Sequence, residues 1–350
     1  MTPRTFIALS VVTAITVAAA AVSVANRPSA TYIPKDRPYV FAGLDEKLND
    51  TFSIAIRNAD RQFTVRRAKD GWGIEELNDY PAKFDNVKTL LVQLAQLRYL
   101  EPKTADPERF GRLELRDVTV KGSKASKVTV KDKEGRVLAE GLIGKRNADL
   151  FGTGRGGTYM RIAGKTESWL IEGSATLGDG PADWVSRRIV DIKSDVVKRL
   201  EITSPSKGKV VVDRNAPTDK DFKLHDLPAG KNQRGQWETN QMPKAFEALD
   251  LVDLKRADEV KFGDGATYMG QFETFDGLLI NTEAAQVGKK YWVRLSASTT
   301  GGAGDDARKQ AAAINARHKG YVYEVKEEVG KKLACDHKNL LDGAGTNACA

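Results

Sequence analysis

Apolar residues recur at every second position in many short runs of this chain, and this alternation restricts its fold more than any other feature. The first two runs are Phe52, Ile54 and Ile56, then Phe63 and Val65, with the polar residues 58–60 between them. Successive side chains of a strand point to opposite faces, so these runs predict a β-hairpin. A third short strand is predicted at 72–74.

The spacing becomes helical after Pro81. Apolar side chains then fall three or four positions apart, at Val87, Leu90, Leu91, Leu94 and Leu97. Pro81 and Pro102 bound this stretch, since proline interrupts helices. One helix with a single apolar side is therefore expected from Asp85 onwards, and a sheet is the partner it needs.

Strand patterns then resume, and the second half of the chain repeats the order of the first. Strands are predicted at 118–120, 128–130, 137–143, 159–162 and 169–171, and again at 200–202, 210–212, 222–224, 267–275, 278–282 and 290–296. A shorter helix is predicted to carry Met242, Phe246, Leu249 and Val252 on its apolar side. The period of about 145 residues is that of two domains rather than a solenoid. A final helix at 305–318 and a last edge strand at 321–325 follow.

The predicted fold class is α+β, with tandem β-rich modules. Each module is an antiparallel sheet packed by one main helix, and an N-terminal transmembrane helix precedes them. The expected boundaries are an anchor or signal peptide (1–26), a linker (27–40), a first module (41–182), a connecting segment (183–197), a second module (198–328) and a tail (329–350).

The N-terminus contains twenty consecutive uncharged residues, Phe6–Ala25, after Arg4. A helix of this length spans a hydrocarbon core of about 30 Å. The small residues Ser23 and Ala25 also suit signal-peptidase cleavage before Asn26. We favour an uncleaved anchor, and both interpretations place the body outside the cytoplasm.

The two cysteines, Cys335 and Cys349, both lie in the last sixteen residues. We favour a disulfide in an oxidising compartment, worth on the order of 3 kcal/mol at most. Free thiols are one alternative. A metal site with His337 is another, although its spacing differs from that of structural zinc sites.

The net charge is +8, but basic and acidic residues alternate along the chain, as in 121–140. Nucleic-acid-binding proteins usually cluster basic residues on one face among aromatic residues. We therefore expect a mixed, solvated surface and no nucleic-acid partner.

Several short motifs together resemble a known family. They are Asp70-Gly71-Trp72, Tyr80-Pro81-Ala82, the helix 87–100, Phe110-Gly111, Leu142-Ile143-Gly144, Tyr159-Met160-Arg161, Trp169-Leu170-Ile171 and Asp183-Trp184. Over about residues 40–300 the chain resembles the DUF4340 family of bacterial envelope proteins. The resemblance implies an N-terminally anchored α+β protein with repeated modules, often encoded beside ABC-type transport components of the gliding-motility kind. This chain departs from the usual pattern by placing Arg112 between Phe110-Gly111 and Leu113. No catalytic residue is carried over.

Catalytic and cofactor-binding constellations are sparse. His225, His318 and His337 lie far apart in the sequence and lack metal-ligand spacing, so structural roles are favoured over metal binding. The glycine-rich string 152–157 lacks the Lys-Ser/Thr of a P-loop and is expected to be a hairpin loop rather than a phosphate site. Glu75 and Glu76 are adjacent and are expected on opposite faces of a strand. We predict no catalytic, cofactor-binding or metal-binding residues.

Of the five tryptophans, Trp237 lies in the polar loop 231–240 and is the one expected to contact a partner. The favoured function is a non-enzymatic envelope protein that presents its body to other envelope proteins, including ABC transporter subunits, from the inner membrane into the periplasm. A soluble periplasmic protein is the alternative after signal cleavage. A glycan- or peptidoglycan-binding module and an enzyme of unknown type are the alternative functions.

Overall fold

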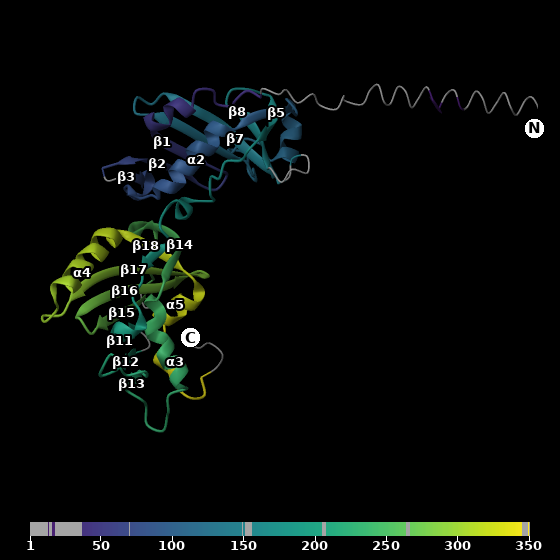
Figure 1. Ribbon diagram of the computed structural model, residues 1–350. Helices are drawn as coiled ribbons and strands as arrows, with labels where there is room; N and C mark the ends of the chain where they lie inside the picture. Colours follow the sequence, from purple (N-terminus) through teal and green to yellow (C-terminus); the bar gives the residue numbers. More distant parts are fainter. Residues whose placement is uncertain are drawn as a thin grey trace, which may run out of the picture. The chain divides into compact units, whose positions relative to one another are not determined.

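The computed structural model describes residues 13, 16–17, 37–69, 71–148, 150, 156–204, 208–263, 267–344 and 349. Within these residues the chain forms two nine-stranded antiparallel sheets and a few helices (Figure 1). The expectation of two antiparallel sheets accompanied by helices is confirmed.

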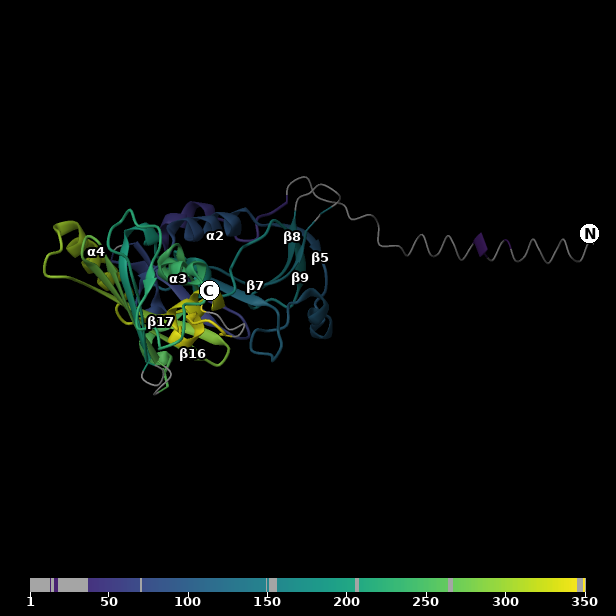
Figure 2. The same cartoon turned by 90° about the horizontal axis from the view of Figure 1, so that it is seen from below.

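The first sheet contains the predicted hairpin. Its strands are β1 (Thr51–Arg57), β2 (Gln62–Ala68), β3 (Gly71–Ile74), β4 (Tyr80–Pro81), β5 (Arg98–Pro102), β6 (Ser126–Asp132), β7 (Val137–Asn147), β8 (Gly157–Ile162) and β9 (Ser168–Glu172). Their order is β4-β3-β2-β1-β6-β7-β8-β9-β5. Strands β7, β8, β9 and β5, which are neighbours in this order, are labelled in Figure 2. Ile54 pairs with Val130 and Val130 with Ala139, so these buried side chains share one face.

The predicted helix is α2 (Phe84–Gln96). Val87, Leu90 and Leu94 are fully buried and Leu91 nearly so, as the helical spacing predicted. The helix ends one residue before Leu97, whose amide still bonds to the Leu94 carbonyl.

The second sheet is also antiparallel, but its strands are connected in a different order. Its strands are β10 (Arg188–Val190), β11 (Val197–Ser204), β12 (Gly208–Asp213), β13 (Lys223–Leu224), β14 (Leu249–Arg256), β15 (Thr267–Thr274), β16 (Leu278–Val287), β17 (Lys290–Thr299) and β18 (Tyr321–Val325). Their order is β10-β14-β18-β17-β16-β15-β11-β12-β13. Leu200, Phe272 and Ile280 are cross-strand partners on the apolar face. Gln271, Asn281 and Ser296 are partners on the opposite, polar face.

Among the described residues, three α-helices accompany the second sheet, where one main helix and a final helix at 305–318 were expected. They are α3 (Gln236–Gln241), α4 (Asp305–His318) and α5 (Glu327–Leu333). α4 matches the predicted 305–318 helix. It buries Ala307, Ala311, Ile314 and His318, one side of the helix, and packs against β17. The segment 329–350, predicted to be a tail, thus begins within α5.

Short 3-10 helices fill several connections. They are η1 (Asp45–Asp50), η2 (Glu75–Leu77), η3 (Pro107–Leu113), η4 (Pro181–Trp184), η5 (Ser194–Val196), η6 (Met242–Phe246), η7 (Ala257–Glu259) and η8 (His337–Leu340).

The prediction of a strand at 118–120 is wrong. The Asp117 carboxylate accepts hydrogen bonds from the Thr119 amide (3.0 Å) and hydroxyl (2.9 Å), and the Val120 amide bonds to the Asp117 carbonyl. Such an Asx turn satisfies the backbone locally, and it overrides the β propensity of the two valines.

The helix predicted through Val252 is also wrong in its second half. Met242 and Phe246 lie on η6, but Leu249 opens strand β14. η6 ends at Phe246, and Glu247 is already extended. Ala248 follows with φ of 49°, and its amide donates to the Asp191 carboxylate (2.9 Å). Two apolar residues at helical spacing therefore belong to a strand.

The strand predicted at 321–325 exists, but it is not an edge strand. β18 lies between β14 and β17 and pairs with both. Its alternating sequence is the same in either position, so only the arrangement of the sheet decides this.

The described residues group into two compact units. One contains Lys88–Leu177 and the chain up to Gln62, and the other contains Phe63–Val87 and the chain from Gly178 onwards. Strands β3 and β4 of the first sheet thus belong to the same unit as the second sheet.

No helix among the described residues has the length and apolarity that a membrane crossing requires. The predicted segment Phe6–Ala25 lies outside the described residues except at 13, 16 and 17.

Candidate functional site

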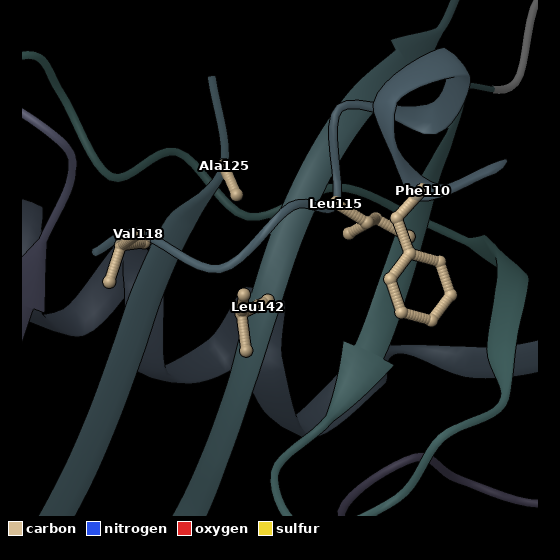
Figure 3. Close-up of a cluster of buried hydrophobic side chains, with 5 residues drawn as sticks. All are labelled: Phe110, Leu115, Val118, Ala125 and Leu142. Carbon is tan, nitrogen blue, oxygen red and sulfur yellow. The ribbon is translucent and has the colours of Figure 1, made fainter. Parts of the chain in front are cut away.

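The Phe-Gly and Leu-Ile-Gly motifs contribute to a hydrophobic cluster formed by β7 and the segment before β6. Figure 3 shows this cluster, which consists of Phe110, Leu115, Val118, Ala125 and Leu142. Tyr159 of the Tyr-Met-Arg motif packs against it, and the Arg161 guanidinium lies 4.9 Å from the Phe110 ring centre. The Phe-Gly, Leu-Ile-Gly and Tyr-Met-Arg motifs therefore meet in three dimensions as packing residues.

The surroundings of Gly144 explain why the Leu-Ile-Gly motif ends in glycine. A Cβ at this position would fall against the carbonyl oxygens of Leu113 and Glu114, 2.8 Å from the latter. The close approach of two backbones requires glycine here. Arg112, the residue that departs from the family pattern, is exposed on η3 and is accommodated outside the cluster.

The Asp-Gly-Trp, Tyr-Pro-Ala and Asp-Trp motifs lie in the other compact unit, where they join the segment 63–87 to the segment 178–185. The Ala82 amide bonds to the Trp72 carbonyl (2.8 Å), and the Lys83 amide bonds to the Trp184 carbonyl (2.7 Å). Trp184 is almost fully buried, and the Phe63 ring meets its indole edge-on. These motif residues also have a packing role.

A buried series of hydrogen-bonded polar side chains, His318, Tyr323 and Tyr80, lies in the same unit. The His318 Nδ1 lies 2.8 Å from the Tyr323 hydroxyl, which donates to the Tyr80 hydroxyl at 3.5 Å. Burial, reinforced by the positive charge of Arg317, lowers the pKa of His318 to about 4. Burial also raises the pKa of Tyr323. His318 and Tyr323 therefore stay uncharged at neutral pH, which suits a structural hydrogen-bond network more than proton transfer.

The other two histidines, which are distant in the sequence, are adjacent in the structure. His337 Nε2 lies 3.1 Å from the His225 carbonyl oxygen, and the His225 ring bonds to the Asp213 carboxylate at 2.7 Å. Among the residues that the structure describes, no group of His, Cys, Asp or Glu side chains is arranged to hold a metal ion.

Two pairs of adjacent carboxylates, Glu75-Glu76 and Asp305-Asp306, do not form facing dyads. Glu75 and Glu76 lie on η2 rather than on the expected strand, where Arg66 contacts Glu75 (3.2 Å) and the Thr64 amide donates to Glu76 (2.7 Å). Asp305 and Asp306 occupy the first turn of α4, where negative charge stabilises the helix. Of the glycine-rich string, residues 152–155 lie outside the described part of the chain.

The described residues of the unit that contains the second sheet line at least two cavities. One, of about 470 Å³, is lined by Asp191, Lys193, Asp195, Phe275 and Asp276 among others. The other, of about 530 Å³, is lined by Met269, Asn281, Glu283, Arg294 and Ser296 among others. Glu283 and Arg294 pair with each other at 3.1 Å, and Arg294 also donates to two backbone carbonyls, so these charges already have protein partners.

Trp237 is the most exposed tryptophan of the described residues. Its side chain is 63% exposed, whereas Trp72, Trp184 and Trp292 are buried and Trp169 is half-buried against Tyr99. Contrary to the predicted loop, Trp237 lies on helix α3, so its backbone has a defined conformation.

The segment that leads into α3 is paired with the end of the chain. The Arg234 amide donates to the Leu340 carbonyl (2.7 Å), the Asp342 amide donates to the Asn232 carbonyl (2.9 Å), and Gln233 and Leu341 form an antiparallel bridge. Cys335 and Cys349, both buried, are joined in a disulfide with a Cα–Cα distance of 5.3 Å. The sequence predicts roles for Trp237 and for the two cysteines separately. The contact between their segments is not predictable from it, because about a hundred residues separate them and no periodic pattern indicates such a contact.

No curated protein and no solved structure matches this chain. Residues 72–268 match the family model described as Domain of unknown function (DUF4340). This match covers more than half of the 350 residues and includes most of the motifs described above. The chain therefore belongs to the DUF4340 family.

Proposed function

We propose that this protein is a non-enzymatic component of the bacterial cell envelope. It is anchored in the inner membrane by its N-terminal segment and presents its two sheets, as tandem modules, to other proteins of the periplasm. Its partners include subunits of an ABC-type transport system, to which it is an accessory. The last point follows from the family resemblance.

Two features support the location. The uncharged stretch Phe6–Ala25 has the length of a membrane-spanning helix. The disulfide between Cys335 and Cys349 suits an oxidising compartment such as the periplasm, because cytoplasmic thiols are kept reduced. Blocking free thiols in intact cells, followed by non-reducing electrophoresis, tests this point. Finding both cysteines of the native protein free would contradict the periplasmic location.

The observation that carries the interaction function is the exposure of Trp237 on an ordered helix. Exposing a tryptophan to water is unfavourable, since its large apolar surface is stabilised by burial. Tryptophan is also enriched among the few residues that dominate protein interfaces. Trp237 is 63% exposed, whereas three other tryptophans of the protein are buried, and it is thus suited to bind a partner.

The test compares Trp237→Ala with Phe84→Ala. Phe84 is the matched control, since it is an aromatic residue with 60% exposure at the start of another helix. The full-length protein is purified from cells after mild cross-linking, and its partners are identified by mass spectrometry. We expect Trp237→Ala to lose partners that Phe84→Ala retains. An unchanged set of partners would refute the role of Trp237.

Glycan binding is a second candidate, favoured by the polar face of the second sheet. Gln271 donates to Asn281 at 3.1 Å and Asn281 donates to Ser298 at 3.3 Å, which gives a row of amides and hydroxyls on partly exposed strands. Such groups match the hydrogen-bonding capacity of sugar hydroxyls. Co-sedimentation with purified peptidoglycan tests this candidate. Retention that Asn281→Ala weakens would support it, and the absence of retention would remove it.

A further inference from the structure

The C-terminal tail supports the segment that carries Trp237. Residues 232–234 immediately precede α3, and the hydrogen bonds to Leu340 and Asp342 described above attach them to the tail on both sides of the Gln233–Leu341 bridge. The Arg234 side chain adds a longer bond to the Ala344 carbonyl at 3.4 Å. The start of α3 is therefore held by the tail's backbone, and movement of the tail would move the base of the helix.

The tail is in turn fixed to the second sheet and to itself. Leu340 is buried, and the Tyr268 hydroxyl of β15 donates to the Asp336 carboxylate at 3.0 Å. The Cys335–Cys349 disulfide closes the tail, with both sulfur-bearing residues buried. A disulfide restricts the conformations of the loop that it closes, so it favours the docked tail over detached ones.

Two ion pairs join charged residues near Trp237, and the exposed Lys338 of the tail belongs to neither. Arg234 contacts Glu238 at 3.5 Å, and Lys231 contacts Asp342 of the tail at 3.8 Å. An apolar anchor whose neighbouring charges are mostly paired internally, with one lysine left over, has little net charge with which to attract anionic lipids or nucleic acids. It has the character of a protein interface, in which a central aromatic residue enters an apolar pocket and the polar rim excludes water.

We infer that residues 231–238 and the tail residues 337–344 form one composite interaction surface. Its partner is a folded protein with an apolar pocket that receives Trp237, and the disulfide keeps the tail half of the surface in place. This inference rests on the proposed interaction function and adds to it the second half of the surface and the chemistry of the partner.

Photo-cross-linking in intact cells tests the partner. The full-length protein carries p-benzoylphenylalanine in place of Trp237, of the exposed tail residue Lys338, or of Phe84 as control. We expect an adduct with the same protein from the first two positions and not from the third. Adducts of lipid mass at Trp237, or different proteins at Trp237 and Lys338, would overturn the inference.

Charge reversal tests the tail half directly. In Asp342→Lys, the contact with Lys231 becomes a repulsion at a half-exposed site. Asp258→Lys is the control, since Asp258 is an exposed carboxylate that pairs with Arg256 away from this surface. We expect Asp342→Lys to lower the yield of the Trp237 adduct at least about tenfold, with an unchanged melting temperature, and Asp258→Lys to leave it unchanged. A wild-type yield from Asp342→Lys would overturn the composite surface.

The role of the disulfide is tested in the variant Cys335→Ala/Cys349→Ala. Hydrogen exchange of the backbone amides at 232–241 is expected to quicken at least about tenfold, while the amides of β15–β17 exchange as before. Equal protection of 232–241 in both proteins would refute this role. If this variant does not fold, the Asp342→Lys result still decides the composite surface. Loss of partners in Trp237→Ala but not in Asp342→Lys would leave the proposed function standing and remove only the present inference.

Discussion

The side chain of Asn315 pairs with both backbone groups of Ala297. Its Nδ2 donates to the Ala297 carbonyl at 2.7 Å, and its Oδ1 accepts from the Ala297 amide at 2.8 Å. Pairing of β17 with β18 ends at Val293, so the amide of a helical residue replaces the missing strand. Asn315 thereby joins α4 to the edge of the sheet.

Replacing Asn315 by Leu should therefore destabilise the protein. The Ala297 amide and carbonyl would lose their partners, and the free energy of unfolding should fall by about 2 kcal/mol. Urea denaturation measures the change. Lys309→Leu, at an exposed position of the same helix, is the control and should change stability by less than about 0.5 kcal/mol. Similar losses in both variants would argue against the proposed role of the Asn315 amide.

Stability should decrease in acid because of His318. Its pKa of about 4 in the folded protein is below its ordinary value of 6.5, so the unfolded chain binds more protons between these values. The contribution is complete above pH 6.5 and is lost as the pH falls towards 4. At ~1.4 kcal/mol per pH unit, the loss is about 3 kcal/mol. Urea denaturation between pH 4 and 7 should show a flatter dependence in His318→Gln, and equal slopes would contradict this assignment.

Gly144→Ala should weaken the cluster shown in Figure 3. The added methyl group would press on the carbonyl oxygens of Leu113 and Glu114, which are backbone atoms that cannot rotate away. We expect a loss of about 1–3 kcal/mol. Gly301→Ala, where no atom lies within 4 Å of the new methyl group, is the control. A melting temperature of Gly144→Ala equal to that of the control would refute the close approach.

Arg214→Met should destabilise the second compact unit. The buried guanidinium donates to the carbonyl oxygens of Val197 (2.9 Å), Asp219 (2.9 Å) and Ser194 (2.8 Å). It also lies against the Phe222 and Phe275 rings. Burial lowers the pKa of Arg214, yet three carbonyl acceptors still stabilise its charge. Leaving these carbonyl oxygens unpaired should lower the free energy of unfolding by about 2–4 kcal/mol, as measured by thermal denaturation. Arg308→Met, on the exposed surface of α4, should have little effect, and an equally small effect of Arg214→Met would show that water replaces the guanidinium.

Local sequence patterns determined those elements whose residues contact one another within a few positions. The hairpin of β1 and β2 follows from alternation around a polar turn, and α2 follows from helical spacing between recognisable boundaries. These patterns are reliable because both the backbone hydrogen bonds and the buried side are set over one or two turns. The family motifs were also readable, since each is a short string.

Tertiary structure alone decided which sequence segments contact one another. Val118 and Val120 look like a strand but form a turn around Asp117, and Leu249 lies at helical spacing from Phe246 but begins β14. Trp237 becomes part of an ordered surface because Leu340 and Asp342, over a hundred positions away, bond to the residues before it. Hydrophobic periodicity records which side of an element is buried, but it carries no information on the partner that buries it. That choice depends on packing and hydrogen bonding summed over the whole domain.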